Sequence, residues 1–168
     1  MTSWHFKVAL GWLLVMATVI FGAWRFESVI RNGRIAFIPL LPVDPRAPLL
    51  GDYMQLNYGL GEELNCAPAE PPAKPCAQTG TAQLELNERS IGTALRHNRV
   101  GASASGNTIA LRYRLHEGRV VYGNGQAFFF TEGSAERFVL ARFAEFRIAD
   151  DGRAVLVGLR GENLEELQ

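Results

Sequence analysis

The two cysteines of this chain are the first residues whose spacing could support chemistry. Cys66 and Cys76 bracket a segment, Ala-Pro-Ala-Glu-Pro-Pro-Ala-Lys-Pro, that is too rich in proline for a helix or a strand. A disulfide would remove chain entropy worth about 2–3 kcal/mol, provided that the backbone allows the bridge. A metal pair is disfavoured, because zinc takes four ligands and His97 and His116 lack a ligand-like spacing to the cysteines. Two unrelated free thiols are the third alternative; the disulfide is favoured, and no metal or cofactor is expected.

Residues that serve covalent hydrolysis are present but poorly placed for it. A serine–lysine peptidase needs a desolvated lysine base, whereas Lys7 precedes an apolar segment and Lys74 lies in the proline-rich loop. A Ser-His-Asp site would draw on His97, in the basic stretch Arg96-His97-Asn98-Arg99, or on His116, in an expected hairpin turn. Histidines in such positions are usually exposed polar residues. No nucleophile elbow or phosphate-binding loop appears, so we expect no enzymatic activity.

Composition limits the classes of partner. The 168 residues include 17 basic and 17 acidic side chains, and 48% are hydrophobic. A chain this apolar can bury enough surface to fold, and its length suits about one domain. Nucleic acid is not expected as a partner, because there is no basic excess to neutralise phosphates.

An uncharged apolar segment, Val8 to Trp24, lies near the N-terminus. As a helix it would rise about 25 Å, slightly less than a hydrocarbon core of about 30 Å. Lys7 and Arg25 can extend toward the headgroups, and aromatic residues flank both ends. A buried helix of a soluble domain would need partners on every side. A cleaved signal peptide would need an Ala-x-Ala site that is missing at the exit from the segment. The sequence therefore predicts an uncleaved anchor in a lipid bilayer.

The orientation of this anchor is ambiguous by charge. Lys7 precedes the segment, while Arg25, Arg31 and Arg34 follow it, which alone would hold the downstream side in the cytoplasm. However, long domains translocate largely regardless of nearby charge, and the extreme N-terminal position is typical of a signal anchor. A disulfide would also require an oxidising compartment. We therefore expect a single-pass protein of the inner (cytoplasmic) membrane with its C-terminal domain in the periplasm.

The remaining chain predicts a small, mostly antiparallel β domain. The anchor and a juxtamembrane helix occupy 1–33, and Asn32-Gly33 forms a left-handed stop. An extended, proline-rich strap follows over 34–50, with prolines at every third residue from Pro39 to Pro48. The β domain covers 51–168. Its expected elements are strands at 53–58, 83–87 and 127–131, the last buried on both faces, hairpins over 108–122 and 144–160, and one short helix at 135–142 capped by Ser134.

Several motifs resemble those of the bacterial GDYXXLXY family. The first block matches the name of the family completely, with Gly51, Asp52, Tyr53, Leu56 and Tyr58. Later segments are similar to its second block, Tyr122-Gly123 with Phe129-Phe130-Thr131-Glu132-Gly133, and to its C-terminal hairpin, Asp151-Gly152-Arg153-Ala154 with Gly158-Leu159. Thr131 departs from the usual proline before Glu132 and Gly133, so that turn is less rigid here. The resemblance implies a single-span envelope protein, of a kind thought to accompany multi-span membrane proteins, without an assigned activity.

The motif also has a physical interpretation of its own. Gly51 can take a positive φ, and Asp52 can close the resulting turn by accepting a backbone N–H. Tyr53 and Tyr58 fall on opposite faces of a strand. A turn followed by a strand start is favoured over a catalytic Asp52. A carboxylate pair of Asp52 and Glu132 is kept as a hypothesis.

These observations predict a non-enzymatic accessory or partner-binding domain whose partner is another integral membrane protein. The alternative is a membrane-tethered hydrolase or small-ligand sensor that uses Asp52 and Glu132. A deep pocket joining these residues would favour the alternative, and a flat apolar patch would favour partner binding.

Overall fold

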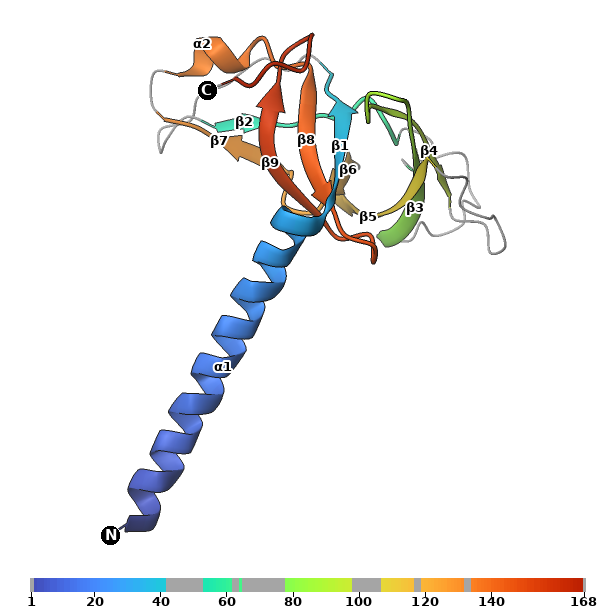
Figure 1. The fold of residues 1–168 in the computed structure, drawn as a ribbon. Helices are drawn as coiled ribbons and strands as arrows, with labels where there is room; N and C mark the ends of the chain where they lie inside the picture. Colours follow the sequence, from blue (N-terminus) through green and yellow to red (C-terminus); the bar gives the residue numbers. More distant parts are fainter. Residues whose placement is uncertain are drawn as a thin grey trace, which may run out of the picture.

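A long helix, α1 (Thr2–Asn32), projects from a body of β-strands in the computed structural model of the chain (Figure 1). The structure describes residues 2–41, 53–61, 64, 78–97, 107–116, 119–131 and 134–167. The 31 residues of α1 extend about 46 Å at 1.5 Å per residue. Its most apolar window has a mean hydropathy of 2.0, and none of that window is buried. The helix is therefore long and apolar enough to cross a membrane, as a single span or a signal anchor.

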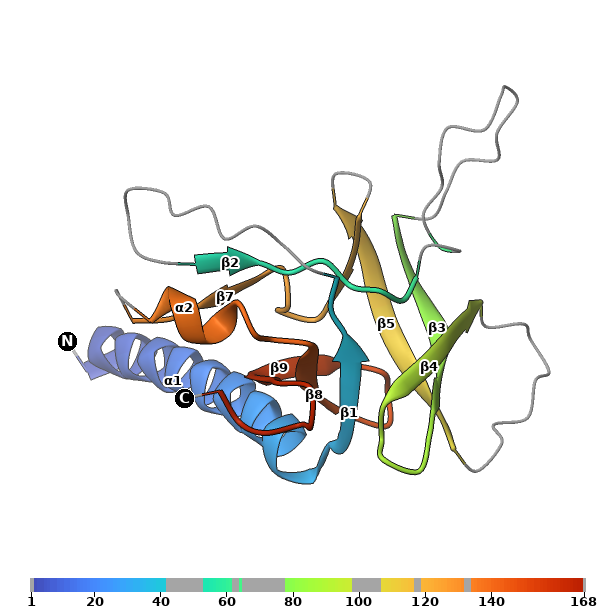
Figure 2. The same ribbon diagram turned by 90° about the horizontal axis from the view of Figure 1, so that it is seen from above.

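The described strands form three antiparallel sheets, which Figures 1 and 2 show from two directions. The first has the order β1-β8-β9, with β1 (Arg34–Pro39), β8 (Phe143–Ile148) and β9 (Ala154–Arg160). The second pairs β2 (Tyr53–Gln55) with β7 (Ala127–Phe129). The third has the order β4-β3-β5-β6, with β3 (Thr79–Leu86), β4 (Gly92–His97), β5 (Thr108–His116) and β6 (Arg119–Tyr122). The expected fold class, mostly β with one short helix after the N-terminal helix, is confirmed.

Strand β1 connects the first sheet to the third. Its residues alternate, so that Ala36 and Ile38 are fully buried while Ile35 is exposed. The edge of β1 that does not pair with β8 reaches the turn between β3 and β4, where the Phe37 N–H donates to the Ser90 carbonyl oxygen at 2.9 Å. Phe37 also forms a parallel bridge with Ile91. The two larger sheets are therefore joined by backbone hydrogen bonding as well as by the core.

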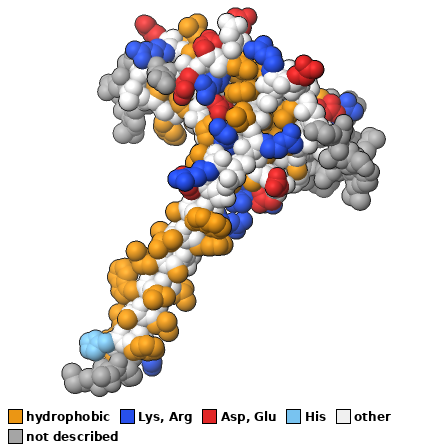
Figure 3. Space-filling model, in the orientation of Figure 1, with side chains coloured by type: hydrophobic (Ala, Val, Ile, Leu, Met, Phe, Trp, Pro, Cys, Tyr) orange, Lys and Arg blue, Asp and Glu red, His pale blue; other side chains and the backbone are white. Residues whose placement is uncertain are grey.

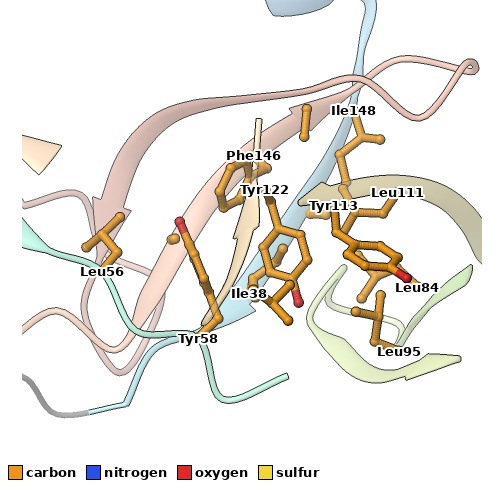
Figure 4. Packing of buried hydrophobic residues seen from close by; sticks show 14 of the residues in the cluster. Ile38, Leu56, Tyr58, Leu84, Leu95, Leu111, Tyr113, Tyr122, Phe146 and Ile148 are labelled. Atoms are coloured by element: carbon orange, nitrogen blue, oxygen red, sulfur yellow. The ribbon is translucent and has the colours of Figure 1, made fainter. Parts of the chain in front are cut away.

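One hydrophobic core lies between the sheets. It includes inward-facing residues of β3 and β5, such as Leu84 and Leu111, and of β8, such as Phe146 and Ile148 (Figure 4). The hairpins expected over 108–122 and 144–160 are confirmed as β5–β6 and β8–β9. The second hairpin turns at Gly152, whose φ of +83° is a conformation that suits glycine.

The end of α1 was assigned to the correct residues for the wrong reason. The helix ends at Asn32, as expected, and the Gly33 N–H donates to the Val29 carbonyl oxygen at 2.8 Å. However, Gly33 does not have the positive φ of a left-handed stop. A glycine is needed here because a Cβ would collide with the Val29 carbonyl oxygen and lie 3.0 Å from the Ile148 backbone nitrogen. Close packing of α1 against β8 explains the residue.

Two other expectations about the elements were wrong. The strand at 127–131 is shorter and is not buried on both faces, because Phe129 is 76% exposed in a sheet of only two strands. The helix α2 (Ala135–Phe138) ends before Arg142, whose N–H already bonds to the Arg160 carbonyl oxygen of the first sheet. Ser134 directly precedes α2, as expected of a cap, and its backbone carbonyl oxygen accepts the Arg137 N–H at 3.1 Å, while its hydroxyl donates to the Thr131 carbonyl oxygen at 2.7 Å.

Strand β4 was not anticipated. The sequence around Arg96 and His97 reads as a solvated basic stretch, but these residues end an edge strand that pairs with β3. Arg96 Nε lies 3.0 Å from Glu85 Oε1 on β3. Arg96, which the sequence pattern assigned to a solvated stretch, therefore forms an ion pair across two strands.

Residues 42–50, with the expected polyproline segment, lie outside the described residues.

Candidate functional site

The described part of the motif runs from Tyr53 to Tyr58 and alternates as predicted. Met54, Leu56 and Tyr58 are buried, whereas Tyr53 is exposed on the opposite face. Only Tyr53–Gln55 forms a regular strand, and Tyr58 makes an isolated bridge to Leu40. The motif therefore places one tyrosine at the surface and the other in the core.

Tyr58 lies at the centre of an aromatic cluster (Figure 4). Its ring centroid is 4.8 Å from that of Tyr122 on β6 and 5.9 Å from that of Phe146 on β8. Tyr122 and Phe146 meet edge to face at 6.3 Å. Tilted and edge-to-face contacts are the geometries in which aromatic rings attract one another. The motif tyrosine thus fills the space between two sheets.

Both tyrosine hydroxyls in this cluster are hydrogen-bonded to the backbone. The Tyr58 hydroxyl donates to the Gly125 carbonyl oxygen in the β6–β7 turn. The Tyr122 hydroxyl donates to the Leu60 carbonyl oxygen at 2.8 Å, just beyond the motif. The two bonds run in opposite directions, one leaving the motif segment and one arriving at it. They fix the segment to the β6–β7 region at two points.

Burial raises the pKa of Tyr58 well above its ordinary value, and the neighbouring Tyr122 raises it further. Burial alone raises the pKa of Tyr122 in the same direction. Both phenols therefore stay protonated near neutral pH and act as hydrogen-bond donors. Neither supplies a phenolate for acid–base or nucleophilic chemistry at that pH.

Backbone hydrogen bonds hold the same segment on its other side. The Leu41 N–H donates to the Asn57 carbonyl oxygen, and the Gly59 N–H donates to the Pro39 carbonyl oxygen. These bonds continue the path of β1 along the motif segment. Together with the tyrosine hydroxyls, these bonds attach residues 56–61 both to the end of β1 and to the β6–β7 turn.

A family model for GDYXXLXY proteins matches residues 15–159, which is most of the chain. The protein belongs to the GDYXXLXY family. No curated protein matches the chain, and no solved structure matches it. The final tyrosine of the family motif is the core residue Tyr58, and the leucine is the buried Leu56. In this member, the described half of the motif is thus built into the packing of the domain.

The other motif residues are only partly placed. Gly51, Asp52, Glu132 and Gly133 lie outside the described residues, as do Cys66 and Cys76, so the carboxylate pair and the disulfide stay predictions. Two described residues of the same motif blocks do meet. Tyr53 on β2 pairs with Phe129 on β7, and their ring centroids are 5.9 Å apart. The described part of the chain contains no cluster of three or more His, Cys, Asp or Glu that could hold a metal.

A buried ion pair was not anticipated from the sequence. Glu145 on β8 is only 5% exposed, and Arg160 on β9 donates to its Oε2 at 2.6 Å from Nε. Arg160 also reaches Glu166 at 3.5 Å, and Arg147 lies 3.9 Å from Glu145. Glu145 faces Gly158 across the sheet at a register shift, where the neighbouring strand has no side chain. A lone glutamate in a strand carries no pattern that marks it as buried, so no sequence signal was available.

A hollow lies between the motif strand and α2. It encloses about 250 Å³, and its lining is mainly aliphatic and aromatic, with Asn57 and Arg142 as its polar members. Met54 and Leu56 form one wall, and Phe138 and Val139 form another. Val139 and Leu140 are 50% and 63% exposed. This side of the domain combines a hollow with exposed apolar side chains.

Proposed function

We propose that this protein is a single-pass, membrane-anchored accessory protein whose β domain binds another integral membrane protein from the periplasmic side of the inner membrane. The proposal assigns no catalytic step to the domain. The observation that carries it is the combination of an exposed apolar helix with a small body that has exposed apolar side chains of its own.

Three of the exposed apolar side chains of the body lie at the α2 end of the domain. Figure 1 places α2 on the side of the body away from α1. Val139 and Leu140 follow α2, and Leu41 lies in the wall of the same hollow as Val139. Large apolar side chains gathered at a surface are typical of protein interaction sites. This α2 surface, defined by Leu41, Val139 and Leu140, is the face that we expect to meet the partner.

The α2 surface is tested by affinity purification of the full-length chain in a mild detergent. We expect a membrane protein to co-purify with the wild type and to be lost from the variant Val139→Asp with Leu140→Asp. The matched control is Val157→Asp, since Val157 is exposed on β9 at 38%. Recovery of a lone monomer in several detergents, or equal recovery of the partner with both variants, would contradict the proposal.

The periplasmic location is tested separately. A reporter fused after Gln168 should be active only outside the cytoplasm, and Cys66 and Cys76 should resist a membrane-impermeant thiol reagent until a reductant is added. A cytoplasmic reporter would reject the location. The variant Asp52→Asn with Glu132→Gln should keep the fold and the cellular phenotype. Loss of the phenotype with the fold intact would favour a hydrolase or ligand sensor instead.

A further inference from the structure

A second hollow, of about 380 Å³, lies where α1 enters the body. Helix α1 forms one wall, and the start of β9, the middle of β5 and the β6–β7 turn form the others. The residues that matter here are Phe26, Val29, Arg112, Asn124, Arg153 and Val155. Val29 and Val155 are buried, and Phe26 is half exposed. The hollow therefore has an apolar floor and a polar rim.

The rim carries a net positive charge. Arg153 Nε lies 2.7 Å and Arg112 Nη2 lies 3.8 Å from the same oxygen, Asp151 Oδ2. One carboxylate thus faces two guanidinium groups, each with five N–H donors. Both arginine side chains keep more than a third of their surface exposed. Both guanidinium groups therefore keep N–H donors that are not used by Asp151 and can bind a further anion.

Asn124 adds a neutral donor to this rim. Its Oδ1 accepts the Leu156 N–H at 2.7 Å, which fixes the orientation of the amide group. The Nδ2 hydrogens of Asn124 have no acceptor within the described residues and remain available to a ligand. A phosphate at the rim could therefore accept hydrogen bonds from two guanidinium groups and one amide, a donor set suited to an oxyanion.

The position of the hollow along α1 indicates where such a phosphate would come from. The uncharged segment ends at Trp24, and Phe26 and Val29 lie two and five residues further along the same helix. At 1.5 Å per residue these positions are about 3 and 8 Å beyond the end of the apolar segment. The headgroup layer of a bilayer occupies about 5–8 Å on each side of the hydrocarbon core. Figure 3 shows basic side chains on the body around this junction.

We propose that this juxtamembrane hollow binds the headgroup of an anionic phospholipid from the leaflet in which α1 ends. The phosphate sits between Arg112 and Arg153, and the upper part of the acyl chains packs against Phe26. A lipid is the one phosphate source that the helix itself brings to this height. The inference rests on the proposed insertion of α1 into a membrane.

The test uses the full-length chain in maltoside micelles with an equimolar mixture of phosphatidylglycerol and phosphatidylcholine. Native mass spectrometry counts the adducts of each lipid. We expect the wild type to retain phosphatidylglycerol over phosphatidylcholine by about tenfold, because both lipids offer a phosphate but only phosphatidylcholine brings a choline cation that the two guanidinium groups repel. The variant Arg112→Gln with Arg153→Gln should bring this ratio close to one.

Two further variants separate a site from a general effect of charge or of unfolding. Arg89→Gln with Arg137→Gln removes the same charge from the β3–β4 turn and α2, and it should keep the wild-type ratio. Asn124→Asp keeps the acceptor for Leu156 but replaces the amide donor with a negative charge, so it should lose the preference without loss of the fold. Melting curves in the same micelles check the folding of each variant.

Three results would overturn the inference. These are equal retention of the two lipids by the wild type, an unchanged ratio in both rim variants, and an equal loss in the Arg89 and Arg137 control. A rim variant that keeps its lipid ratio but loses a co-purifying protein would assign the hollow to that protein instead. Carbonate extraction of cell membranes distinguishes the two proposals. A chain that is released by carbonate contradicts membrane insertion, whereas a retained chain without lipid preference contradicts only the lipid site.

Discussion

Replacing Tyr58 with phenylalanine removes a single buried hydroxyl from the family motif. The ring keeps its contacts with Tyr122 and Phe146, so the change isolates the hydrogen bond to the Gly125 carbonyl oxygen. A net intramolecular hydrogen bond contributes about 1 kcal/mol, and a buried acceptor left without a partner costs about 1–3 kcal/mol. We therefore expect the free energy of unfolding to fall by about 2 kcal/mol.

This change is measured by thermal unfolding of the full-length chain in micelles, followed by near-ultraviolet circular dichroism. For a domain of this size, a loss of 2 kcal/mol lowers Tm by about 6–10 °C. The family motif supplies its own control, because Tyr53→Phe removes a hydroxyl from a side chain that is 36% exposed. That substitution should change the free energy of unfolding by less than about 0.5 kcal/mol.

A double-mutant cycle tests whether the two buried hydroxyls act together. Tyr122→Phe removes the hydrogen bond to the Leu60 carbonyl oxygen, at the other end of the segment 56–61. Since both bonds fix one segment, the double variant should lose less stability than the sum of the single variants, by at least about 0.5 kcal/mol. If Tyr58→Phe has the same Tm as the wild type while Tyr53→Phe has a lower Tm, the assignment of Tyr58 as the core tyrosine is wrong.

Three further predictions concern other parts of the domain. Glu145→Gln should lower the free energy of unfolding by about 3 kcal/mol, because it leaves the Arg160 guanidinium with only part of its ion pairing. The control is Glu85→Gln, which removes the carboxylate of an exposed ion pair and should cost less than about 1 kcal/mol in the same denaturant titration. Gly125→Ala should destabilise the fold by about 1–3 kcal/mol, since its Cβ would lie 2.7 Å from the Phe146 ring, while Gly158→Ala, with open space around it, should be neutral. Desolvation acts to raise the pKa of Asp151, but hydrogen bonds from Arg153 and the charges of Arg153 and Arg112 outweigh it and hold that pKa below its ordinary value of 3.8. A carboxyl group with a depressed pKa in the folded state adds stability above about pH 4, and this stability is lost as the pH falls. The variant Asp151→Asn should therefore show a smaller decrease of Tm between about pH 5 and pH 3 than the wild type. An equally steep decrease in the variant would contradict this prediction.

The local elements of this protein follow from short-range patterns in the sequence. The charge-free segment before Arg25 predicted a helix able to cross a membrane, because apolar length is a property of the chain alone. Alternation in the motif predicted that Tyr53 and Tyr58 lie on opposite faces, since side chains on a strand alternate between its two faces. The family motif could likewise be read directly, and the family model confirmed it.

The wrong or missing predictions all concern what covers a residue. Three phenylalanines in a row predicted a fully buried strand, but β7 pairs only with β2, so Phe129 has no neighbouring layer over it. Glu145 gave no sign of burial, because its partner Arg160 is supplied by the next strand. A helix predicted to reach Arg142 was cut short because that residue joins a sheet.

The sequence by itself determined the long apolar helix, several of the strands and the two faces of the motif, because each depends on neighbours within a few residues. Only the tertiary structure decided that Tyr58 meets Tyr122 and Phe146, and that Arg112 and Arg153 converge beside Phe26. These meetings depend on strand order and register, which bring together residues separated by 60 or more positions, from Tyr58 to Tyr122 in one case and from Phe26 to Arg112 in the other. Both proposed interaction sites are made of such long-range contacts.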